Sequence, residues 1–257
     1  MQRIVFFAYG VACHLLFLGV YAYMAAFFGN FLVPKTVDSG PSGPVGSAVV
    51  VNLLLVALFG LQHSIMARPW FKRMWTRFVP PPIERSTYVL ASCLVTAFLL
   101  WQWRPIDAVI WQFNGGFGWW IMTCLFAIGW LGVPAVSMMI NHFDLFGTRQ
   151  VWLHLRGKEY EPLPFHTPFA YGYVRHPIYV GWACAFWATP TMTAGHALLA
   201  ASLTAYMLIA VVFEERDLVA HFGAKYTDYC QRVPRYFPRR RYTPAVVEPT
   251  PSNSVAS

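Results

Sequence analysis

The sequence predicts an all-α integral membrane protein with about six transmembrane helices. Of its 257 residues, 57% are hydrophobic and only 12% are charged, whereas an average soluble domain carries about 25% charged residues. Residues 4–32 contain no charged side chain and exceed the roughly 20 apolar residues that a helix needs to cross the hydrocarbon core. All but two of the 19 Lys and Arg residues fall on one side of the predicted spans. A soluble two-domain enzyme is therefore excluded.

The first four spans are separated by segments that cannot continue a helix through lipid. The first span, 4–32, ends before the Pro- and Gly-rich loop 35–46, because proline and glycine interrupt helices. Three further apolar spans follow, over 45–66, 86–103 and 119–140. Residues 141–175 are too rich in charge to lie in the hydrocarbon core.

The last apolar block, 178–213, is predicted to fold into a helical hairpin. It is too long for one ordinary span and carries the polar sequence TPTMTAGH at 189–196 in its middle. A turn at Pro190–His196 divides it into two short helices, and the predicted spans are 177–193 and 197–213. These complete the count of six.

Six spans place both termini and the loops 67–85 and 141–175 on the same side of the membrane. These segments hold 17 of the 19 Lys and Arg residues, and the opposite side holds only Lys35 and Arg104. The positive-inside rule assigns the basic side, and with it both termini, to the cytoplasm. The net charge of +8 is thus explained by topology and by attraction to anionic lipid. We expect no nucleic-acid partner, because no base-stacking or groove-reading motif accompanies the charge.

Residues 1–241 are predicted to form a single membrane domain, followed by a disordered tail over 242–257. The tail is rich in Pro and Ser, a composition that does not support a packed core. The five Cys residues form no C-x-x-C pair, and no His or Cys spacing matches a metal site. We therefore expect neither a disulfide framework nor a bound metal.

Two polar clusters flank the predicted hairpin. The first is YVRHPIYVGW at 173–182 and the second is FEERDL at 213–218. Gly195, in the predicted turn, lies midway between His176 and Glu214, so antiparallel helices of equal length return both clusters to one membrane face. The side chains expected to converge there are Arg175, His176, Tyr179, Glu214 and Glu215.

The two adjacent acids suggest a cationic ligand. They lie at the C-terminal end of a helix, where the helix dipole disfavours negative charge. Adjacent helical residues point about 100 degrees apart, so Glu214 and Glu215 cannot both serve one partner. The alternative is that Arg175 simply neutralises one of these acids, as ion pairs at membrane interfaces do.

The pattern RHPIY (175–179), a short apolar hairpin, EE (214–215) and HFGAKYTDYCQRVPRYFP (221–238) resembles the signature of the isoprenylcysteine carboxyl methyltransferase and phospholipid methyltransferase superfamily. A longer similarity, to the methanethiol S-methyltransferases of its nitrite-reductase-associated U-like branch, covers most of the first 240 residues. That similarity is carried by LVPKTVDSGP (32–41), LQHSIMARPWFK (61–72), PIERSTYVL (82–90), NHFDLFGTRQVWLHLRG (141–157), YVRHPIYVGW (173–182) and FWATPTMTAGH (186–196).

The resemblance implies transfer of a methyl group from S-adenosylmethionine to methanethiol, giving dimethyl sulfide. It implies a multi-pass enzyme of the bacterial inner membrane, with a cytoplasmic cofactor pocket and no Rossmann domain. The sequence has no G-x-G-x-x-G motif, which agrees. Carried over position by position, the implied cofactor-binding residues are Arg175, His176, Tyr179, Gly181, Glu214, Glu215, Tyr226, Tyr229 and Arg235.

The chemistry of the cofactor suits these residue types. A Glu carboxylate can bind its ammonium or ribose hydroxyls, and Arg175 can pair with its carboxylate. His176 and Tyr179 can hydrogen-bond to the adenine or stack on it. Aromatic faces attract the sulfonium as they attract other soft cations.

A thiol acceptor must lose its proton, and a cysteine-like thiol with a pKa near 8.5 is mostly protonated in the cytosol. His142 and Asp144 lie in NHFD (141–144), where the fourth span leaves the membrane, and are the candidate catalytic bases. Alternatively, both cap a helix end and bind backbone. His63, in the second span, is a further polar residue that could face the pocket.

Two other functions stay open at this point. The acceptor could be another small thiol or a phospholipid amine, or the chain could be a non-catalytic accessory or transport protein of denitrification. A transporter should contain paired broken helices near the bilayer midplane. Here the polar residues gather at one membrane face, which favours an enzyme supplied from the cytosol.

Overall fold

The computed structural model describes residues 1–41 and 43–238, and helices dominate it. The predicted tail over 242–257 lies outside these residues. The helices are α1 (Gln2–Gly29), α2 (Val45–Ala67), α3 (Pro69–Trp75), α4 (Pro81–Gln102), α5 (Gly116–Ile140), α6 (His142–Leu145), α7 (Thr148–Leu155), η1 (Phe169–Gly172), α8 (Pro177–Trp187), α9 (Ala194–Phe222) and α10 (Ala224–Arg232). The strands are β1 (Val109–Gln112) and β2 (Thr191–Thr193).

The prediction of an all-α membrane protein is confirmed. Five helices within the described residues, α1, α2, α4, α5 and α9, are long and apolar enough to cross a bilayer. The fifth predicted span, 177–193, is only partly helical, because α8 has 11 residues and reaches about 17 Å. The count of six crossings therefore stays a prediction.

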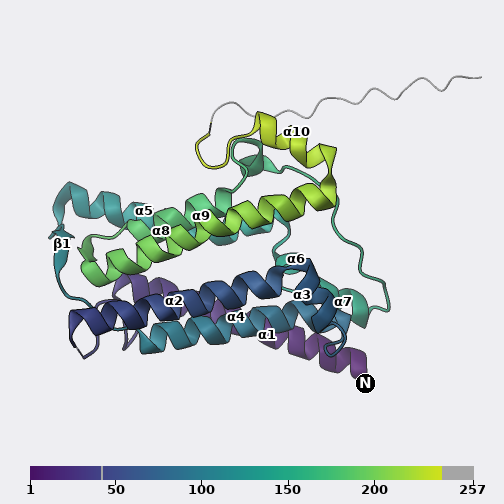
Figure 1. Ribbon diagram of the computed structural model, residues 1–257, viewed down its shortest axis with the longest axis horizontal. Coiled ribbons are helices and arrows are strands. Elements are labelled where there is room, and N and C mark those ends of the chain that lie inside the picture. The colour runs from purple at the N-terminus through teal and green to yellow at the C-terminus, as the bar shows by residue number, and fades with distance from the viewer. Residues whose placement is uncertain (42, 239–257) are drawn as a thin grey trace, which may run out of the picture.

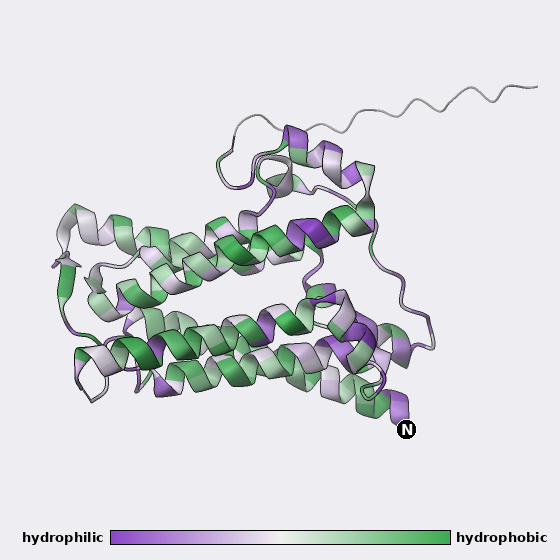
Figure 2. Cartoon of the chain, in the orientation of Figure 1, coloured by the Kyte–Doolittle hydropathy of each residue, from purple (hydrophilic) through white to green (hydrophobic). Residues whose placement is uncertain are grey.

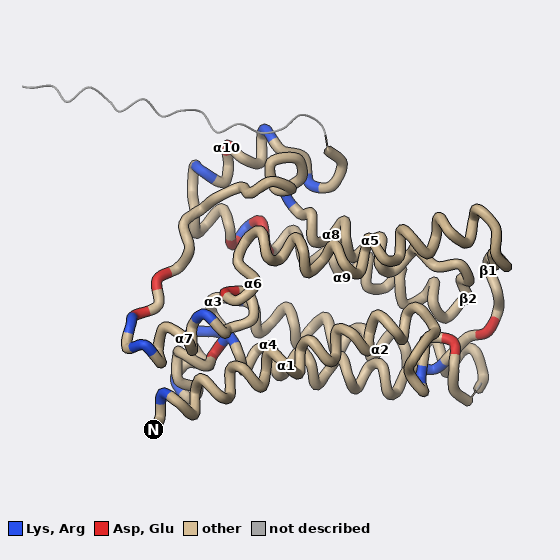
Figure 3. Tube along the Cα trace, turned by 180° about the vertical axis from the view of Figure 1, so that it is seen from behind, with Lys and Arg blue, Asp and Glu red and all other residues tan. Residues whose placement is uncertain are grey.

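The long helices form two layers (Figure 1). In one layer α4 packs against α1 and α2, and in the other α8 packs against α5 and α9; contacts between α2 and α9 join the layers. Hydrophobic residues cover the lengths of these helices, while hydrophilic residues gather toward their ends (Figure 2). Charged residues likewise lie at the two ends of the bundle, most of them at the end that holds the N-terminus (Figure 3).

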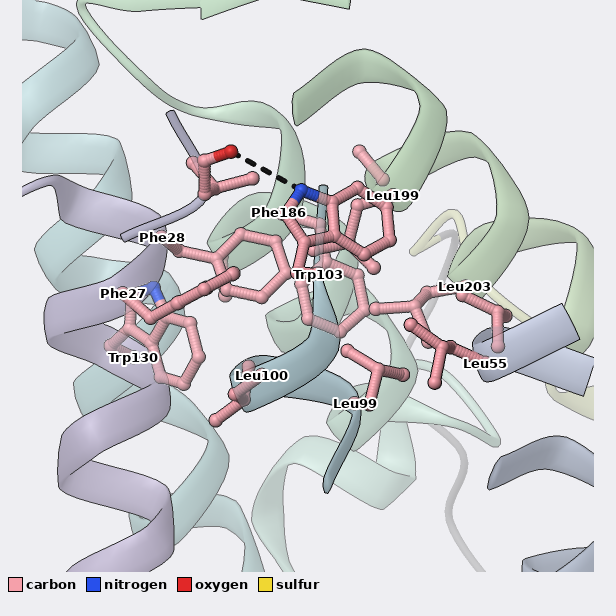
Figure 4. Packing of buried hydrophobic residues seen from close by; sticks show 14 residues of the cluster. Phe27, Phe28, Leu55, Leu99, Leu100, Trp103, Trp130, Phe186, Leu199 and Leu203 are labelled. Carbon is pink, nitrogen blue, oxygen red and sulfur yellow. Dashed lines mark hydrogen bonds between the residues drawn. The ribbon is translucent and has the colours of Figure 1, made fainter. Parts of the chain in front are cut away.

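Aromatic and aliphatic side chains from both layers form the main core (Figure 4). Phe28 stacks on Phe186 with ring centroids 5.2 Å apart, and both are buried. Trp103 is buried at the end of α4, and its indole Nε1 donates to the carbonyl of Val37 at 3.2 Å. This bond satisfies the polar atom of the indole, as burial of Trp requires.

Helices α5 and α8 pack with their backbones in close approach. A Cβ on Gly129 would lie 2.4 Å from the backbone nitrogen of Ala185, and a Cβ on Gly181 would lie 3.0 Å from Cγ2 of Val133. Small residues at such positions are what allow helices to approach closely in a membrane. The two contacts also fix an antiparallel register, in which Ser137 on α5 lies level with Pro177 at the start of α8.

The carbonyls of Phe186 at the end of α8 and of Thr189 just after it have side-chain partners within the fold. His196, from α9, approaches the carbonyl of Phe186 with Nε2 at 2.9 Å. After α8 the chain extends into β2, which pairs antiparallel with β1. Such bonds are required, because non-helical backbone at membrane depth is stable only when protein or water satisfies it.

Candidate functional site

Glu215 is the centre of a polar cluster formed by α8, α9 and the segment after α10. Its Oε1 accepts from Nε of Arg175 at 2.9 Å and lies 3.1 Å from Nε2 of His176. Its Oε2 accepts from Nε and Nη2 of Arg235 at 3.0 and 2.6 Å. Both carboxylate oxygens are thus committed to partners within the protein.

Arg175 joins this cluster to the C-terminal segment. Besides Glu215, its Nη1 donates to the carbonyl of Cys230 at 2.9 Å and to that of Val233. Its side chain is only 9% exposed. The backbone N–H groups of Arg175 and His176 also donate to the carbonyls of Pro234 and Arg235, at 2.9 and 3.1 Å. The start of α8 and the chain after α10 therefore lie side by side.

Glu214 differs from its neighbour in exposure and in partners. Its Oε2 accepts from the hydroxyl of Tyr179 at 2.6 Å and lies 4.0 Å from Nδ1 of His176. The side chain remains 43% exposed. Burial, and then the charge of Glu214, raise the pKa of Tyr171, so this phenol stays neutral beside the carboxylate. Glu214 is therefore the acid of the pair that can bind an incoming cation.

The predicted convergence of the two sequence clusters is present in the structure. The hairpin brings Arg175, His176 and Tyr179 to Glu214 and Glu215, as their hydrogen bonds show. The physical cause is the turn between α8 and α9, which returns the end of α9 to the start of α8.

Tyr226 and Tyr229 hold α10 in place. Both are buried and pack with Phe165 and Val233 in a small apolar cluster. The Tyr229 hydroxyl donates to the carbonyl of Tyr171 at 2.6 Å. Burial raises the pKa of Tyr226. These two residues therefore fasten α10 to the chain before α8.

Gly181 lies on α8 at its contact with α5. A Cβ there would lie 3.0 Å from Cγ2 of Val133 and 3.8 Å from the carbonyl oxygen of Gly129. The structure thus gives this glycine a packing role, one turn or more from the Glu215 cluster.

The candidate base His142 is buried at the start of α6. Its Nδ1 lies 2.7 Å from Oγ of Ser137, and its ring contacts those of His14 and Phe146, at centroid distances of 5.1 and 4.5 Å. Burial, and then His14, lower the pKa of His142. The imidazole is therefore neutral near pH 7, with one nitrogen able to accept a proton.

The other candidate base, Asp144, is engaged by its neighbours. Its Oδ1 accepts from Nη1 of Arg149 at 2.9 Å and its Oδ2 from the Tyr160 hydroxyl at 3.3 Å. Its backbone N–H donates to Oδ1 of Asn141 at 3.1 Å. Asp144 thus stabilises the turn between α6 and α7, and both of its carboxylate oxygens already have partners within the protein.

Three residues at this end of the bundle escaped the sequence analysis. The Tyr236 hydroxyl is buried without a hydrogen-bond partner among the described residues, and its ring lies 6.4 Å from that of His176. Arg68 donates to Asp217 at 2.8 Å and ties α2 to α9. Tyr236 follows Arg235 directly, and Asp217 belongs to the EERDL run. Their positions next to the predicted site residues could therefore have marked them as candidates. The pairing with Arg68 required the tertiary structure.

His63 lies in α2 among polar partners. Its Nε2 is 2.8 Å from the hydroxyl of Tyr88, and its Nδ1 is 3.2 Å from Oγ of Ser92. Both nitrogens therefore have partners in the bundle, which is the arrangement of a hydrogen-bonded core histidine.

Comparison with known proteins finds close relatives that match most of the chain. The chain is 50% identical over 238 residues to the methanethiol S-methyltransferase of Mycobacterium tuberculosis, covering 93% of this chain and 98% of that protein. It is 48% identical over 252 residues to methanethiol S-methyltransferase 2 of Bradyrhizobium diazoefficiens, covering 97% of each.

A more distant similarity extends to an animal protein. The chain is 30% identical over 178 residues to the Nurim homolog of Drosophila pseudoobscura pseudoobscura, covering 66% of this chain and 70% of that protein. No family model matches the chain, and no solved structure matches it.

Proposed function

Since the chain belongs to the methanethiol S-methyltransferase family, we propose that it transfers a methyl group from S-adenosylmethionine to methanethiol, giving dimethyl sulfide and S-adenosylhomocysteine. The observation that carries this proposal is the 50% identity to a protein of that name over 98% of its length. The cluster around Glu214 and Glu215 is the proposed binding site for the methyl donor.

Two features of the cluster fit a donor that carries both cationic and hydroxyl groups. Glu214 presents a partly exposed carboxylate beside Tyr179, which suits an ammonium or two ribose hydroxyls. The buried Tyr236 hydroxyl has no hydrogen-bond partner in the described part of the chain, and a ligand at this position would satisfy it. We assign direct contacts to Glu214, Tyr179, His176 and Tyr236.

Glu215, Arg175 and Arg235 take a different part in this proposal. Each is already bound to the others or to backbone carbonyls, so a ligand could recruit them only by breaking those bonds. We propose that they fix the walls of the site, and that Tyr226 and Tyr229 hold α10 against it. Gly181 contributes by allowing α8 to lie close to α5.

The reaction itself requires little covalent chemistry from the protein. When bound, the donor supplies a methyl carbon on a positively charged sulfur; the acceptor sulfur bonds to this carbon as the old C–S bond breaks and returns its electron pair to the donor. Opposite charges disappear in this step, so residues that exclude water and orient both reactants favour it. Of the two candidate bases, His142 is the one proposed here, because Asp144 is already paired with Arg149.

We further propose that the site faces the cytoplasm of a bacterial inner membrane. The N-terminus and most of the charged residues lie at the end of the bundle where α9 ends (Figure 3). A basic end is retained on the cytoplasmic side, where the methyl donor and the thiol are both available. A C-terminal fusion to a reporter that works only in the cytoplasm should therefore be active. A fusion to a reporter that works only outside the cytoplasm should be inactive.

The decisive experiment supplies the purified protein, in detergent, with S-adenosylmethionine and methanethiol. Dimethyl sulfide should accumulate in the headspace and depend on both compounds. With phosphatidylethanolamine in place of the thiol, no methylated lipid should form. Production of methylated lipid instead of dimethyl sulfide would move the assignment to the phospholipid branch.

Binding of the methyl donor tests the assigned contacts separately. A hydrogen bond to a charged group contributes about 1.5–3 kcal/mol, so Glu214→Gln and Tyr179→Phe should each weaken donor binding by roughly 10-fold or more. Glu159→Gln, in an exposed loop, and Tyr23→Phe, whose hydroxyl binds the carbonyl of Lys35 at 3.3 Å, are the matched controls. Unchanged affinity in both site variants would place the donor elsewhere.

A further inference from the structure

Ser137 fixes the tautomer of His142. The Ser137 hydroxyl donates its one hydrogen to the carbonyl of Pro134 at 2.7 Å, since a carbonyl oxygen can only accept. Nδ1 of His142, 2.7 Å from the same hydroxyl, must then be the donor. The neutral imidazole therefore carries its proton on Nδ1 and its free electron pair on Nε2.

The backbone at the end of α5 directs His142 back onto this helix. Asn141 has φ of 154° and ψ of 89°, a conformation that residues with a side chain rarely adopt. Its side-chain oxygen accepts from the N–H of Asp144 at 3.1 Å, which stabilises the turn. Strained backbone of this kind persists where the surrounding structure requires one particular side-chain direction.

The surroundings of His142 keep it neutral. The titratable group that faces it from α1 is His14, and α5 contributes the uncharged Ser137. On the α7 side, Arg149 is paired with Asp144. Burial and His14 lower the pKa of His142. Among the described residues, no hydrogen bond engages Nε2, so this electron pair is available.

A series of aromatic rings connects His142 to α8. Phe17 lies 6.3 Å from the His142 ring and 5.8 Å from Tyr21, and Tyr21 lies 5.7 Å from Trp182 on α8. Ser137 is level with the start of α8, by the register of α5 and α8. One face of His142 is therefore next to aromatic rings that continue to α8.

We propose that His142 accepts the proton of the thiol at Nε2, that Ser137 is the positioning residue that keeps Nε2 unprotonated, and that the thiol binds against Phe17 and Tyr21 between α1, α5 and α8. This inference rests on the proposed methyl transfer. The S–H bond breaks, an N–H bond forms at Nε2, and the electron pair stays on sulfur as the nucleophile. A small uncharged thiol suits such a site, because sulfur makes favourable contacts with aromatic rings.

The pH dependence of methyl transfer tests the proton transfer. A general base contributes roughly 10²–10⁴-fold, so His142→Gln should lower kcat at pH 7 by about 100-fold. Ser137→Ala should lower it by about 5–10-fold, the equivalent of one neutral hydrogen bond. Both deficits should shrink as the pH rises toward the pKa of methanethiol, which lies above the roughly 8.5 of cysteine because no amide groups withdraw electrons from its sulfur; the acceptor then ionises without help. Donor affinity should be unchanged.

Matched variants separate positioning from folding. Ser137→Thr retains the hydroxyl and should restore kcat to within a few-fold of the original protein. Ser202→Ala removes a hydroxyl that donates to the carbonyl of Leu198 at 2.6 Å, with no histidine attached, and should leave the pH profile unchanged. A Phe17→Ala variant should raise KM for the thiol more than it lowers kcat.

A spectroscopic readout is independent of activity. The ¹⁵N shifts of labelled histidine, with the His142 signals identified by their loss in His142→Gln, should show the Nδ1–H tautomer in the original protein and a mixture in Ser137→Ala. A dominant Nε2–H tautomer in the original protein would overturn the proposal. Deficits in kcat of His142→Gln and Ser137→Ala that stay constant across pH would also overturn it. If the original protein releases no dimethyl sulfide, methyl transfer itself is wrong, while the tautomer measurement still tests the pairing of Ser137 and His142.

Discussion

Arg235 binds Glu215 through two nitrogens, with Nη2 2.6 Å and Nε 3.0 Å from the same carboxylate oxygen. This pair joins the chain after α10 to the end of α9. The other oxygen of Glu215 binds Arg175 at the start of α8. One carboxylate thus holds three segments together at the end of the bundle where the methyl donor is proposed to bind.

Removal of that carboxylate should destabilise the fold. Glu215→Ala leaves the guanidinium of Arg175, 9% exposed, without its counter-charge, and breaking a buried pair in this way costs about 3–5 kcal/mol. We expect a corresponding loss in the free energy of unfolding, measured by denaturant titration in detergent. Glu159→Ala, on an exposed loop, should change stability by less than about 0.5 kcal/mol. Equal stability of the two variants would contradict the central role of Glu215.

The reactivity of Cys230 should show whether Arg235 holds the chain after α10 against the end of α9. Burial raises the pKa of its thiol, so the reactive thiolate is scarce at neutral pH and alkylation should accelerate as pH rises past the ordinary value, near 8.5. Arg235→Ala should speed alkylation of Cys230 at neutral pH, because the opened segment exposes the thiol to the reagent. Mass spectrometry of the peptide that contains Cys230 measures this rate.

Arg232→Ala is the control for that experiment. Arg232 pairs with Asp228 within α10 at 2.7 Å, so its loss leaves the Glu215 cluster intact. Alkylation of Cys230 at the same rate in Arg232→Ala and Arg235→Ala would show that Arg235 does not close the segment.

The close packing of α5 on α8 should tolerate no added methyl group at Gly129. A Cβ there would lie 2.4 Å from the backbone nitrogen of Ala185, so the helices must move apart, and overpacking of this kind costs about 1–3 kcal/mol. Gly129→Ala should lower Tm in detergent. Gly132→Ala, on the same helix, meets no atom within 4 Å and should leave Tm unchanged or slightly raised. A lower Tm for Gly132→Ala alone would contradict the packing.

Local sequence sufficed to place α2 and α5, whereas α4 begins five residues before its predicted span and α9 ends nine residues after its own. The helices α2 (Val45–Ala67) and α5 (Gly116–Ile140) begin and end within about three residues of the predicted spans, because apolar length and the flanking Pro and Gly decide where a membrane helix lies. The early end of α8 was not predicted. It depends on the contact of His196 with the carbonyl of Phe186, on the bond from the Trp111 indole to the carbonyl of Thr189, and on the pairing of β1 with β2.

The candidate site was likewise predictable from the sequence only in part. Hydropathy and the turn at the middle of the last apolar block determined that the Arg175 and Glu214 clusters meet, because a hairpin returns the chain to its starting level. Only the tertiary structure decided that two arginines bind Glu215, while the Glu214 side chain stays 43% exposed. It also decided that Asp144 is paired with Arg149, while Nε2 of His142 has no hydrogen bond among the described residues. Glu214 and Glu215 are the same residue type at neighbouring positions, so the sequence cannot distinguish them. They differ in the distant side chains that each one contacts.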